Sequence, residues 1–325
     1  MQALPVLRLL KQHLPESEIY WWIQSNFAPL LDGDPDLAGL ILFERERWGA
    51  PRYWPEVWDS VRRTRTHAFD VVIDLQCLAR SAIFAWLANG QLTIGLDEPR
   101  EGARGFYDRI VPRASYHTHA VDWYLGVLPV LGVPLHWNFQ WLPRRPEIAT
   151  RLRQKWPVAD HRWIVLQPGA RWANKHWPAE SFAELVRRFK TSGAPFRFAV
   201  LGGAEDRLLG ETIVQADPDQ CLDLTGKLSL PEMVEWIRLS ELMVSNDTGP
   251  MHVAAALGKP VVALFGPTEP RRTGPYRQLD SVLQLNLPCV PCMKSHCAWV
   301  RPLECLRALP AEAVFAAASK RLALS

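Results

Sequence analysis

Continuous apolar runs in the first half of the chain are separated by segments with helical spacing. Leu40 to Phe43 and Phe69 to Leu75 are two such runs, and Arg80 to Leu87 has the spacing of a helix that follows the second. Strands buried on both faces show unbroken apolar runs, whereas half-buried strands alternate apolar and polar positions. The pattern predicts a parallel sheet with helices on both faces, a Rossmann-like α/β arrangement.

A second series of predicted elements begins near residue 160. Strands are predicted at WIVLQP, FRFAVLGG, ELMVSN and VVALFG, and helices at SFAELVRRFK, EDRLLGETIV, PEMVEWIRL and MHVAAALG. Between the two series lies HWNFQWLPRRPE, which is rich in proline and aromatic residues, so we expect a linker at about 140 to 158. The sequence therefore predicts two Rossmann-like domains, residues 1–150 and 158–325.

The first predicted element is a helix over ALPVLRLLKQHL, followed by a strand over EIYWWI. A Rossmann domain begins with a strand and the turn that leads into its first helix. We therefore expect that the first strand of the N-terminal domain is missing from this sequence.

The composition is that of an ordinary globular protein with enough apolar material for two cores. Of its 325 residues, 48% are apolar and 22% are charged. The apolar runs are far shorter than the ~20 residues that cross a bilayer. The N-terminus lacks the basic region, apolar stretch and cleavage site of a signal peptide. We expect a cytoplasmic protein without a transmembrane helix.

The net charge of +3 is too small to favour nucleic acid as a partner. The first half nevertheless carries many arginines: Arg62, Arg63, Arg65, Arg80, Arg100, Arg104, Arg109 and Arg113. One interpretation is a basic face directed at an anionic acceptor or a membrane surface. The other is a solvated surface of mixed charge.

The strongest candidate for a binding site is Glu241 to Thr268, where a strand, a polar turn, a small-residue helix and a second strand follow in succession. Backbone N–H groups of Thr248 and Gly249 at the start of the helix favour phosphate. Asp247 is expected to cap the helix, and His252 to point into the same crevice. A purely structural capping turn and a packed histidine are the alternatives.

Two further loops follow predicted strands in the second half. The segment Gln167 to Phe182 contains a glycine and ends its loop near Lys175, a mobile cation that suits a diphosphate; the alternative is a solvated lysine. In FAVLGGAEDR, Glu205 follows two glycines and can bind ribose hydroxyls. The alternative for Glu205 is an acidic residue that complements the helix dipole.

Four cysteines near the C-terminus, Cys289, Cys292, Cys297 and Cys305, begin with a C-x-x-C pair. This spacing suits a structural zinc ion. Free thiols are the alternative, and a catalytic role is not expected.

Motifs along nearly the whole chain carry a resemblance to a known family. They are Leu4-Pro5, Asp74-Leu75-Gln76, Arg80-Ser81, His119-Ala-Val, Gln167-Pro-Gly, Lys175-His-Trp-Pro, Leu224-Thr-Gly-Lys, Asn246-Asp-Thr-Gly-Pro-Met-His-Val-Ala-Ala-Ala-Leu-Gly-Lys-Pro, Phe265-Gly-Pro-Thr and Gly274-Pro-Tyr. The chain resembles glycosyltransferase family 9, the ADP-heptose:lipopolysaccharide heptosyltransferases. The resemblance implies a GT-B fold, in which two Rossmann-like domains face each other across a cleft.

The same resemblance implies the roles of the candidate residues. The C-terminal domain would bind ADP-heptose through Lys175, Glu205, Asp247, Thr248, Gly249 and His252. The N-terminal domain would bind a lipid A-Kdo type acceptor of the inner core, with Arg80, Arg100 and His119 as candidate contacts. Such an acceptor suggests work at the inner face of the inner membrane.

The reaction implied by the resemblance is transfer with inversion and without a catalytic metal. A carboxylate deprotonates the acceptor hydroxyl, which displaces ADP. In the family this base is the aspartate of a Gly-Asp turn before the Leu-Pro segment, a position that precedes Met1, so no residue here is assigned to it. The alternatives left open are a donor-binding protein with impaired catalysis, a mis-started fragment, or a family member that uses another sugar nucleotide or acceptor.

Overall fold

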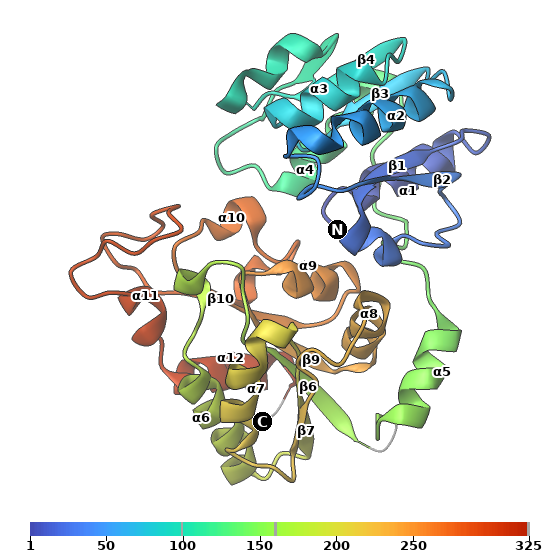
Figure 1. Ribbon diagram of the computed structural model, residues 1–325. Coiled ribbons are helices and arrows are strands. Elements are labelled where there is room, and N and C mark those ends of the chain that lie inside the picture. Colours follow the sequence, from blue (N-terminus) through green and yellow to red (C-terminus); the bar gives the residue numbers. More distant parts are fainter. Residues whose placement is uncertain (99, 159–160, 324–325) are drawn as a thin grey trace. The chain divides into compact units, whose positions relative to one another are not determined.

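The computed structural model describes residues 1–98, 100–158 and 161–323. The chain divides into two compact units: an N-terminal unit of Gln2–Pro143, and a C-terminal unit of Arg144–Ser325 together with Met1. Both units are built from parallel strands and helices (Figure 1). The predicted α/β class is thereby confirmed.

The C-terminal unit contains one sheet of six parallel strands in the order β11-β10-β9-β6-β7-β8. Their bounds are β6 Arg162–Gln167, β7 Phe196–Val200, β8 Cys221–Asp223, β9 Leu242–Asn246, β10 Val261–Phe265 and β11 Val282–Gln284. The chain adds strands outward from β6 through β7 to β8, and then returns to add β9, β10 and β11 on the other side. This is the doubly wound order predicted for a Rossmann-like domain.

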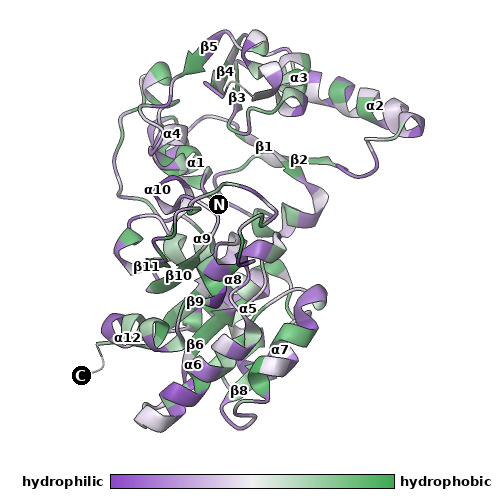
Figure 2. Ribbon diagram, turned by 90° about the vertical axis from the view of Figure 1, so that its left-hand side faces the viewer, coloured by the Kyte–Doolittle hydropathy of each residue, from purple (hydrophilic) through white to green (hydrophobic). Residues whose placement is uncertain are grey.

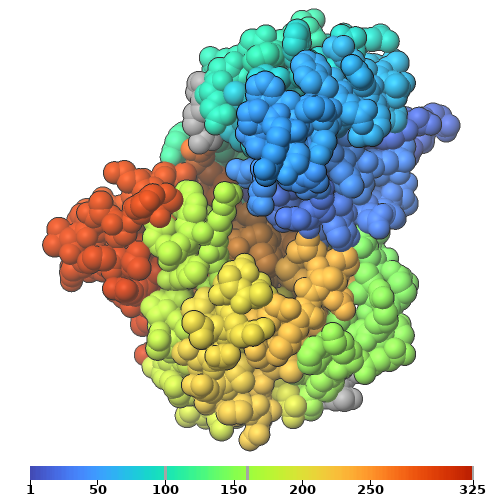
Figure 3. All heavy atoms as spheres, viewed as in Figure 1, coloured from blue at the N-terminus to red at the C-terminus, as the bar shows by residue number. Residues whose placement is uncertain are grey.

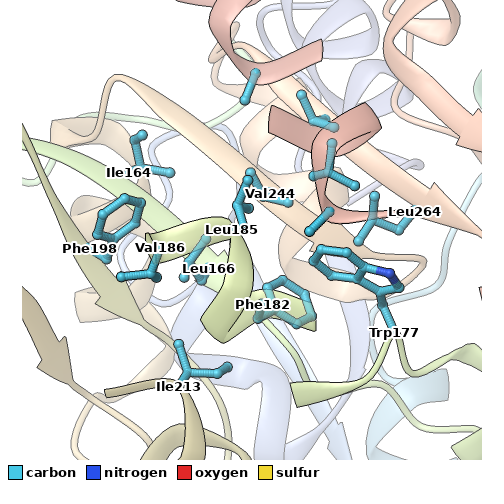
Figure 4. Packing of buried hydrophobic residues seen from close by; sticks show 14 of the residues in the cluster. Ile164, Leu166, Trp177, Phe182, Leu185, Val186, Phe198, Ile213, Val244 and Leu264 are labelled. Carbon is cyan, nitrogen blue, oxygen red and sulfur yellow. The ribbon is translucent and has the colours of Figure 1, made fainter. Parts of the chain in front are cut away.

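Alternate residues of the central strands pack into two separate layers. Ile164 and Leu166 of β6 belong to one core cluster with Phe182 and Val186 of a helix, as Figure 4 shows. Trp163 of β6 packs its ring at 5.4 Å from that of Trp236, which belongs to another helix. Because both faces are covered, β9 and β10 are buried throughout, and the sheet's strands appear largely hydrophobic in Figure 2.

Two sets of helices form these layers. The longer helices that contribute to the core cluster are α6 Ala179–Ser192, α7 Arg207–Val214 and α12 Ala311–Arg321. The second set is α5 Pro146–Lys155, α8 Leu230–Leu239 and α9 Gly249–Ala256, in which α8 contacts both α5 and α9. Short helices complete the unit: η5 Ala173–Lys175, η6 Ala204–Asp206, α10 Pro270–Thr273, η7 Leu279–Ser281 and α11 Glu304–Arg307.

The segment for which a linker was predicted contains helix α5. Pro146 occupies the first turn, where a missing N–H removes no helical hydrogen bond, and Glu147 complements the helix dipole. Ile148, Ala149 and Leu152 are buried on one side of the helix. Their spacing is that of an amphipathic helix, which aromatic and proline residues on its N-terminal side obscured in the sequence.

The N-terminal unit has two separate parallel sheets. One pairs β1 Tyr20–Gln24 with β2 Gly39–Phe43, and the other has the order β3-β4-β5, with bounds Val71–Asp74, Leu92–Leu96 and Arg109–Val111. Its helices are α1 Leu4–His13, η1 Ser25–Leu30, η2 Pro51–Tyr53, α2 Trp54–Arg65, α3 Ala79–Leu87, η3 Arg100–Phe106, α4 Ala120–Leu125 and η4 Pro129–Leu131.

The two sheets of the N-terminal unit leave a gap in the Rossmann strand order. In the Rossmann order, the strand that precedes the first helix lies between the second and fourth strands. Here the first element is α1, so the second and fourth positions fall to β1 and β3, which are not paired. All residues of β1 are only half-buried, in contrast to the buried strands β9 and β10.

The helices of the described residues are too short for a membrane span. Helix α6 has 14 residues, against the ~20 apolar residues that a span needs. Within that part of the chain no helix is both long and apolar enough to cross a bilayer.

Candidate functional site

The C-terminal sheet reverses its winding direction between β6 and β9, which are neighbours. The loops that leave the carboxyl ends of these two strands run in opposite directions, and such a point is where doubly wound sheets bind ligands. The loop after β6 leads to Lys175, and the loop after β9 begins at Asp247. The sheet order therefore brings together two loops that are far apart in the sequence.

Lys175 and Asp247 form an ion pair at this point. The Lys175 Nζ lies 2.5 Å from the Asp247 Oδ2, and the two side chains are only 16% and 7% exposed. The same Nζ lies 4.6 Å from the centre of the Trp172 ring, in a cation–π arrangement. The ammonium group is thus held in place while hydrogen-bond donors remain for a ligand, since it carries three of them.

Asp247 does not cap the helix that follows it, contrary to the prediction. The N-cap of α9 is Thr248, and no side chain caps the helix. The Asp247 Oδ2 instead accepts hydrogen bonds from Lys175 and, at 2.6 Å, from the Thr268 Oγ1. The carboxylate turns toward these two donors from neighbouring loops because they satisfy its charge better than a single backbone N–H does.

The N-terminus of α9 is consequently open to a ligand. Gly249 is its first residue and is exposed, and a Cβ added there would meet no atom within 4 Å. The first N–H groups of a helix have no partner inside the helix and carry its positive dipole end. His252 lies in the first turn of the same helix and is half-buried.

Asn246 connects the two loops and was not identified from the sequence. It is fully buried at the end of β9. Its Nδ2 donates to the carbonyl oxygen of Pro168 at 2.6 Å, and its Oδ1 accepts the backbone N–H of Trp177 at 3.1 Å. An amide that holds both ends of the loop containing Lys175 fixes the position of that lysine. The signal in the sequence was a polar residue at the end of an otherwise buried strand.

The loop after β7 places Glu205 on the exposed side of η6. Its neighbour Asp206 is buried and accepts the backbone N–H of Gly203 at 3.0 Å. Burial raises the pKa of the Asp206 carboxyl above its usual value. A Cβ at Gly169 would lie 2.1 Å from the Asp206 Oδ2, so the loops after β6 and β7 touch where only glycine fits.

The candidate acceptor residues of the N-terminal unit have different surroundings. Arg80 is exposed in the first turn of α3 and lines a groove with aromatic residues. His119 is buried as the N-cap of α4, where its Nδ1 accepts the backbone N–H of Val121 at 3.1 Å. The side chain of Arg100 lies outside the residues that the structure describes.

The predicted zinc site is not supported. Cys289, Cys292, Cys297 and Cys305 line one pocket of about 220 Å³, beside a segment that projects from the C-terminal unit in Figure 3. Among the described residues, however, no His, Cys, Asp or Glu side chains form a group arranged to hold a metal.

The cysteine side chains have other surroundings that explain this outcome. Cys305 belongs to the hydrophobic core, and burial raises the pKa of its thiol to about 11, whereas a metal needs the thiolate. The Cys297 Sγ accepts the backbone N–H of Leu303 at 3.2 Å. The six cysteines are free thiols.

The family model described as glycosyltransferase family 9 (heptosyltransferase) matches residues 57–300. The lipopolysaccharide heptosyltransferase 1 of Pseudomonas aeruginosa is 28% identical over 321 residues, which cover 94% of this chain and 85% of that protein.

Solved structures share the fold of the chain. A glycosyltransferase family 9 protein from Veillonella parvula matches with a TM-score of 0.82 and 24% identity, covering 100% of this chain and 94% of that one. An Escherichia coli heptosyltransferase with ADP matches with a TM-score of 0.75 and 24% identity, covering 98% of this chain and 95% of that one. These similarities support the GT-B fold implied by the sequence motifs.

Proposed function

The chain belongs to glycosyltransferase family 9, and from this premise we propose that it transfers a heptose from ADP-heptose to the inner core of lipopolysaccharide. The observation that carries the proposal is the Lys175–Asp247 ion pair beside the uncapped N-terminus of α9. A held cation and a positive helix end at one crevice suit a ligand with two adjacent phosphates.

The diphosphate contacts are assigned to Lys175 and to the backbone N–H groups of Thr248 and Gly249. Asp247 contributes by orienting the ammonium group, and Thr268 by orienting Asp247. His252, one turn into α9, is assigned to the same donor pocket. The exposed carboxylate of Glu205 is assigned to hydroxyl groups of the nucleoside, since carboxylates accept hydrogen bonds from ribose.

The proposed reaction is a direct displacement at the anomeric carbon of the heptose. The acceptor hydroxyl loses its proton to a base as its oxygen bonds to the anomeric carbon, and the bond to the ADP oxygen breaks, which inverts the configuration. Lys175 and the end of α9 stabilise the negative charge that develops on the departing ADP, so no metal ion is required for this task. No residue of the printed sequence is assigned as the base.

The acceptor side is assigned to the N-terminal unit. A lipid A-Kdo type acceptor carries negative charges, which Arg80 and Arg100 can pair with, and His119 is the third candidate contact. Because such an acceptor is anchored in a bilayer, we place the protein in the cytoplasm, at the inner face of the inner membrane.

The donor assignment is tested by titrating ADP into wild-type protein and into Lys175→Ala in a calorimeter. A hydrogen bond to a charged group contributes about 1.5–3 kcal/mol, which corresponds to about a 10- to 100-fold increase in Kd. The variant also leaves the buried Asp247 carboxylate facing the phosphates, which opposes binding further.

Lys190→Ala is the matched control. Lys190 also forms an ion pair, with its Nζ 3.1 Å from the Asp217 Oδ2, but it lies in the last turn of α6, away from the carboxyl ends of the strands. It should bind ADP as the wild type does. If Lys175→Ala also kept the wild-type Kd, the assignment would be wrong.

A further inference from the structure

An apolar groove in the N-terminal unit has no role in the assignments above, apart from Arg80. Its volume is about 550 Å³. The residues that line it, here called the aromatic groove, are Phe43, Arg45, Trp48, Gly49, Trp54, Val57, Trp58, Arg80, Ile83 and Phe84. The groove therefore combines large apolar side chains with two arginines.

The inner part of the groove is a set of packed rings. The ring of Trp48 lies 6.3 Å from that of Phe43 and 5.7 Å from that of Phe84, between ring centres. Phe43 ends β2, and Arg80, which also lines the groove, lies in the first turn of α3, the helix after β3. The groove is thus anchored to the carboxyl ends of two strands, the edge at which doubly wound sheets bind their ligands.

The outer part of the groove presents tryptophans to solvent. Trp54 is 58% exposed and Trp58 is 56% exposed, although both are large apolar side chains. They are four residues apart in α2, so they lie on one side of the helix, and Arg62 continues the same line after another four residues. Ser60 and Thr64, which are four residues apart, are buried on a different side of α2.

Several arginines beside these tryptophans have no acidic partner among the described residues. Arg47 and Arg63 pair with Glu56 and Asp59. Within the part of the chain that the structure describes, no carboxylate lies within ion-pair distance of Arg45, Arg62 or Arg80. Glu46 is the acidic residue next to Arg45 in the sequence. The surface therefore offers free guanidinium groups around exposed indole rings.

We propose that the aromatic groove and the exposed side of α2 dock the protein onto an anionic bilayer, with Trp54 and Trp58 at the boundary between headgroups and acyl chains. Tryptophan is suited to this boundary because its ring is apolar and its N–H is polar. Arginines near an anionic surface add to the attraction. This inference rests on the proposed function, because docking would bring the carboxyl ends of the N-terminal strands close to an acceptor that is anchored in the membrane.

A second copy of the chain is a poorer occupant of this surface. A symmetric dimer would bring the same patch of both copies together, so that Arg45, Arg62 and Arg80 would face their own counterparts. Like charges at such an interface oppose association. An anionic bilayer complements these charges.

The test is co-sedimentation of the full chain with vesicles that contain no acceptor. Vesicles of phosphatidylcholine mixed with phosphatidylglycerol should bind the protein, and vesicles of phosphatidylcholine alone should bind it more weakly. The double variant Trp54→Ala/Trp58→Ala should lower the partition coefficient on the anionic vesicles about tenfold or more, because it removes the apolar area that enters the boundary. Arg45→Ala/Arg62→Ala should lower it roughly 25-fold, at about fivefold per arginine.

Matched controls remove similar groups from the C-terminal unit. Leu208→Ala/Val300→Ala removes two exposed apolar side chains, and Arg151→Ala/Arg153→Ala removes two exposed arginines of α5. Both should bind vesicles as the wild type does. Calorimetry with ADP should give the wild-type Kd for all four double variants, which separates docking from donor binding.

Three results would overturn the proposal. The first is that the wild-type protein binds neither kind of vesicle. The second is that the Trp54→Ala/Trp58→Ala variant binds vesicles as well as the wild type does. The third is that the wild type forms a dimer in sedimentation analysis and the Trp54→Ala/Trp58→Ala variant does not. None of them bears on donor binding, because no ADP is present in the vesicle assay. Failure of the Lys175 titration would likewise leave the docking result intact.

Discussion

Single carboxylates at the carboxyl ends of the C-terminal strands act through very different neighbours. Asp247 accepts hydrogen bonds from Lys175 and Thr268 and so holds the ammonium group in place. Asp206 is buried against glycines and fills the space between two loops. Asp223, at the end of β8, accepts the backbone N–H and the hydroxyl of Thr225 at 2.9 and 2.7 Å. Position after a strand therefore does not by itself identify a ligand-binding carboxylate.

Asp223 makes the stability of the fold depend on pH. Burial alone would raise the pKa of its carboxyl, but the hydrogen bonds from Thr225 and the charge of Lys227 outweigh this and leave the pKa lowered. A lowered pKa in the folded state stabilises the fold above the unfolded pKa of about 3.9, and this contribution is lost as the pH falls through the folded value. As the pH falls from about 6 to about 3, we expect the free energy of unfolding to decrease less for Asp223→Asn than for the wild type.

Urea unfolding at several pH values measures this difference. Lys227→Ala removes one of the groups that lower the pKa of Asp223. The pH dependence of its stability should therefore lie between those of the wild type and Asp223→Asn. Equal pH dependence in the wild type and Asp223→Asn would show that the carboxylate has no such role.

At the scale of elements, two helices that contact each other begin in opposite ways. Helix α8 starts with a capping box, in which Ser229 and Glu232 satisfy each other's backbone N–H groups. Helix α9 starts at Thr248 with no side-chain cap. A cap contributes about 1 kcal/mol to stability. Helix α9 lacks this contribution at its N-terminus, where we assign a ligand. Functional sites commonly lack local stabilising features such as a helix cap.

Ser229→Ala tests the value of the α8 cap. The Ser229 Oγ accepts the backbone N–H of Glu232 at 3.4 Å, and the Glu232 Oε2 accepts the backbone N–H of Ser229 at 2.8 Å. Loss of the hydroxyl should lower the free energy of unfolding by about 1 kcal/mol. Ser295→Ala, at an exposed position of a loop, is the control and should stay within about 0.5 kcal/mol of the wild type. A loss at Ser229 no larger than that of the control would mean that the cap is not stabilising.

At the scale of the whole molecule, Arg8 forms hydrogen bonds with residues that are far apart in the sequence of the N-terminal unit. Its guanidinium group forms two hydrogen bonds to Asp34, at 2.6 and 2.5 Å, and one to Asp36 at 2.6 Å. It also donates twice to the carbonyl oxygen of Trp141, near the end of the unit. The Asp34 side chain is fully buried, and Arg8 is its positively charged partner.

Arg8→Ala should therefore destabilise the N-terminal unit by about 3–5 kcal/mol, because it leaves the buried Asp34 carboxylate without its positively charged partner. Hydrogen exchange followed by mass spectrometry should show faster exchange in α1 and its neighbours, while β6 and β9 keep wild-type rates. Arg63→Ala, which breaks an exposed pair with Asp59, is the control and should change little. Faster exchange spread evenly over both units would contradict the assignment of this role of Arg8 to the N-terminal unit.

Most of the C-terminal sheet was predictable, and the shortest strands were not. The runs that became β6, β7, β9 and β10 are continuous and apolar because both of their faces are buried. Strands β8 and β11 have three residues each, which is too short for a periodic signal. The exposed tryptophan surface of α2 was likewise not recognised, since the sequence does not say which side of a helix meets solvent.

Local composition by itself determined the strand and helix types, the family resemblance and the residues around the candidate crevice, because these depend on neighbours along the chain. Tertiary structure alone decided what each side chain contacts. Asp247 was expected to cap α9, and it pairs instead with Lys175, 72 residues away, and with Thr268. A carboxylate binds the strongest donors within reach, and only the order of strands in the sheet determines which donors those are.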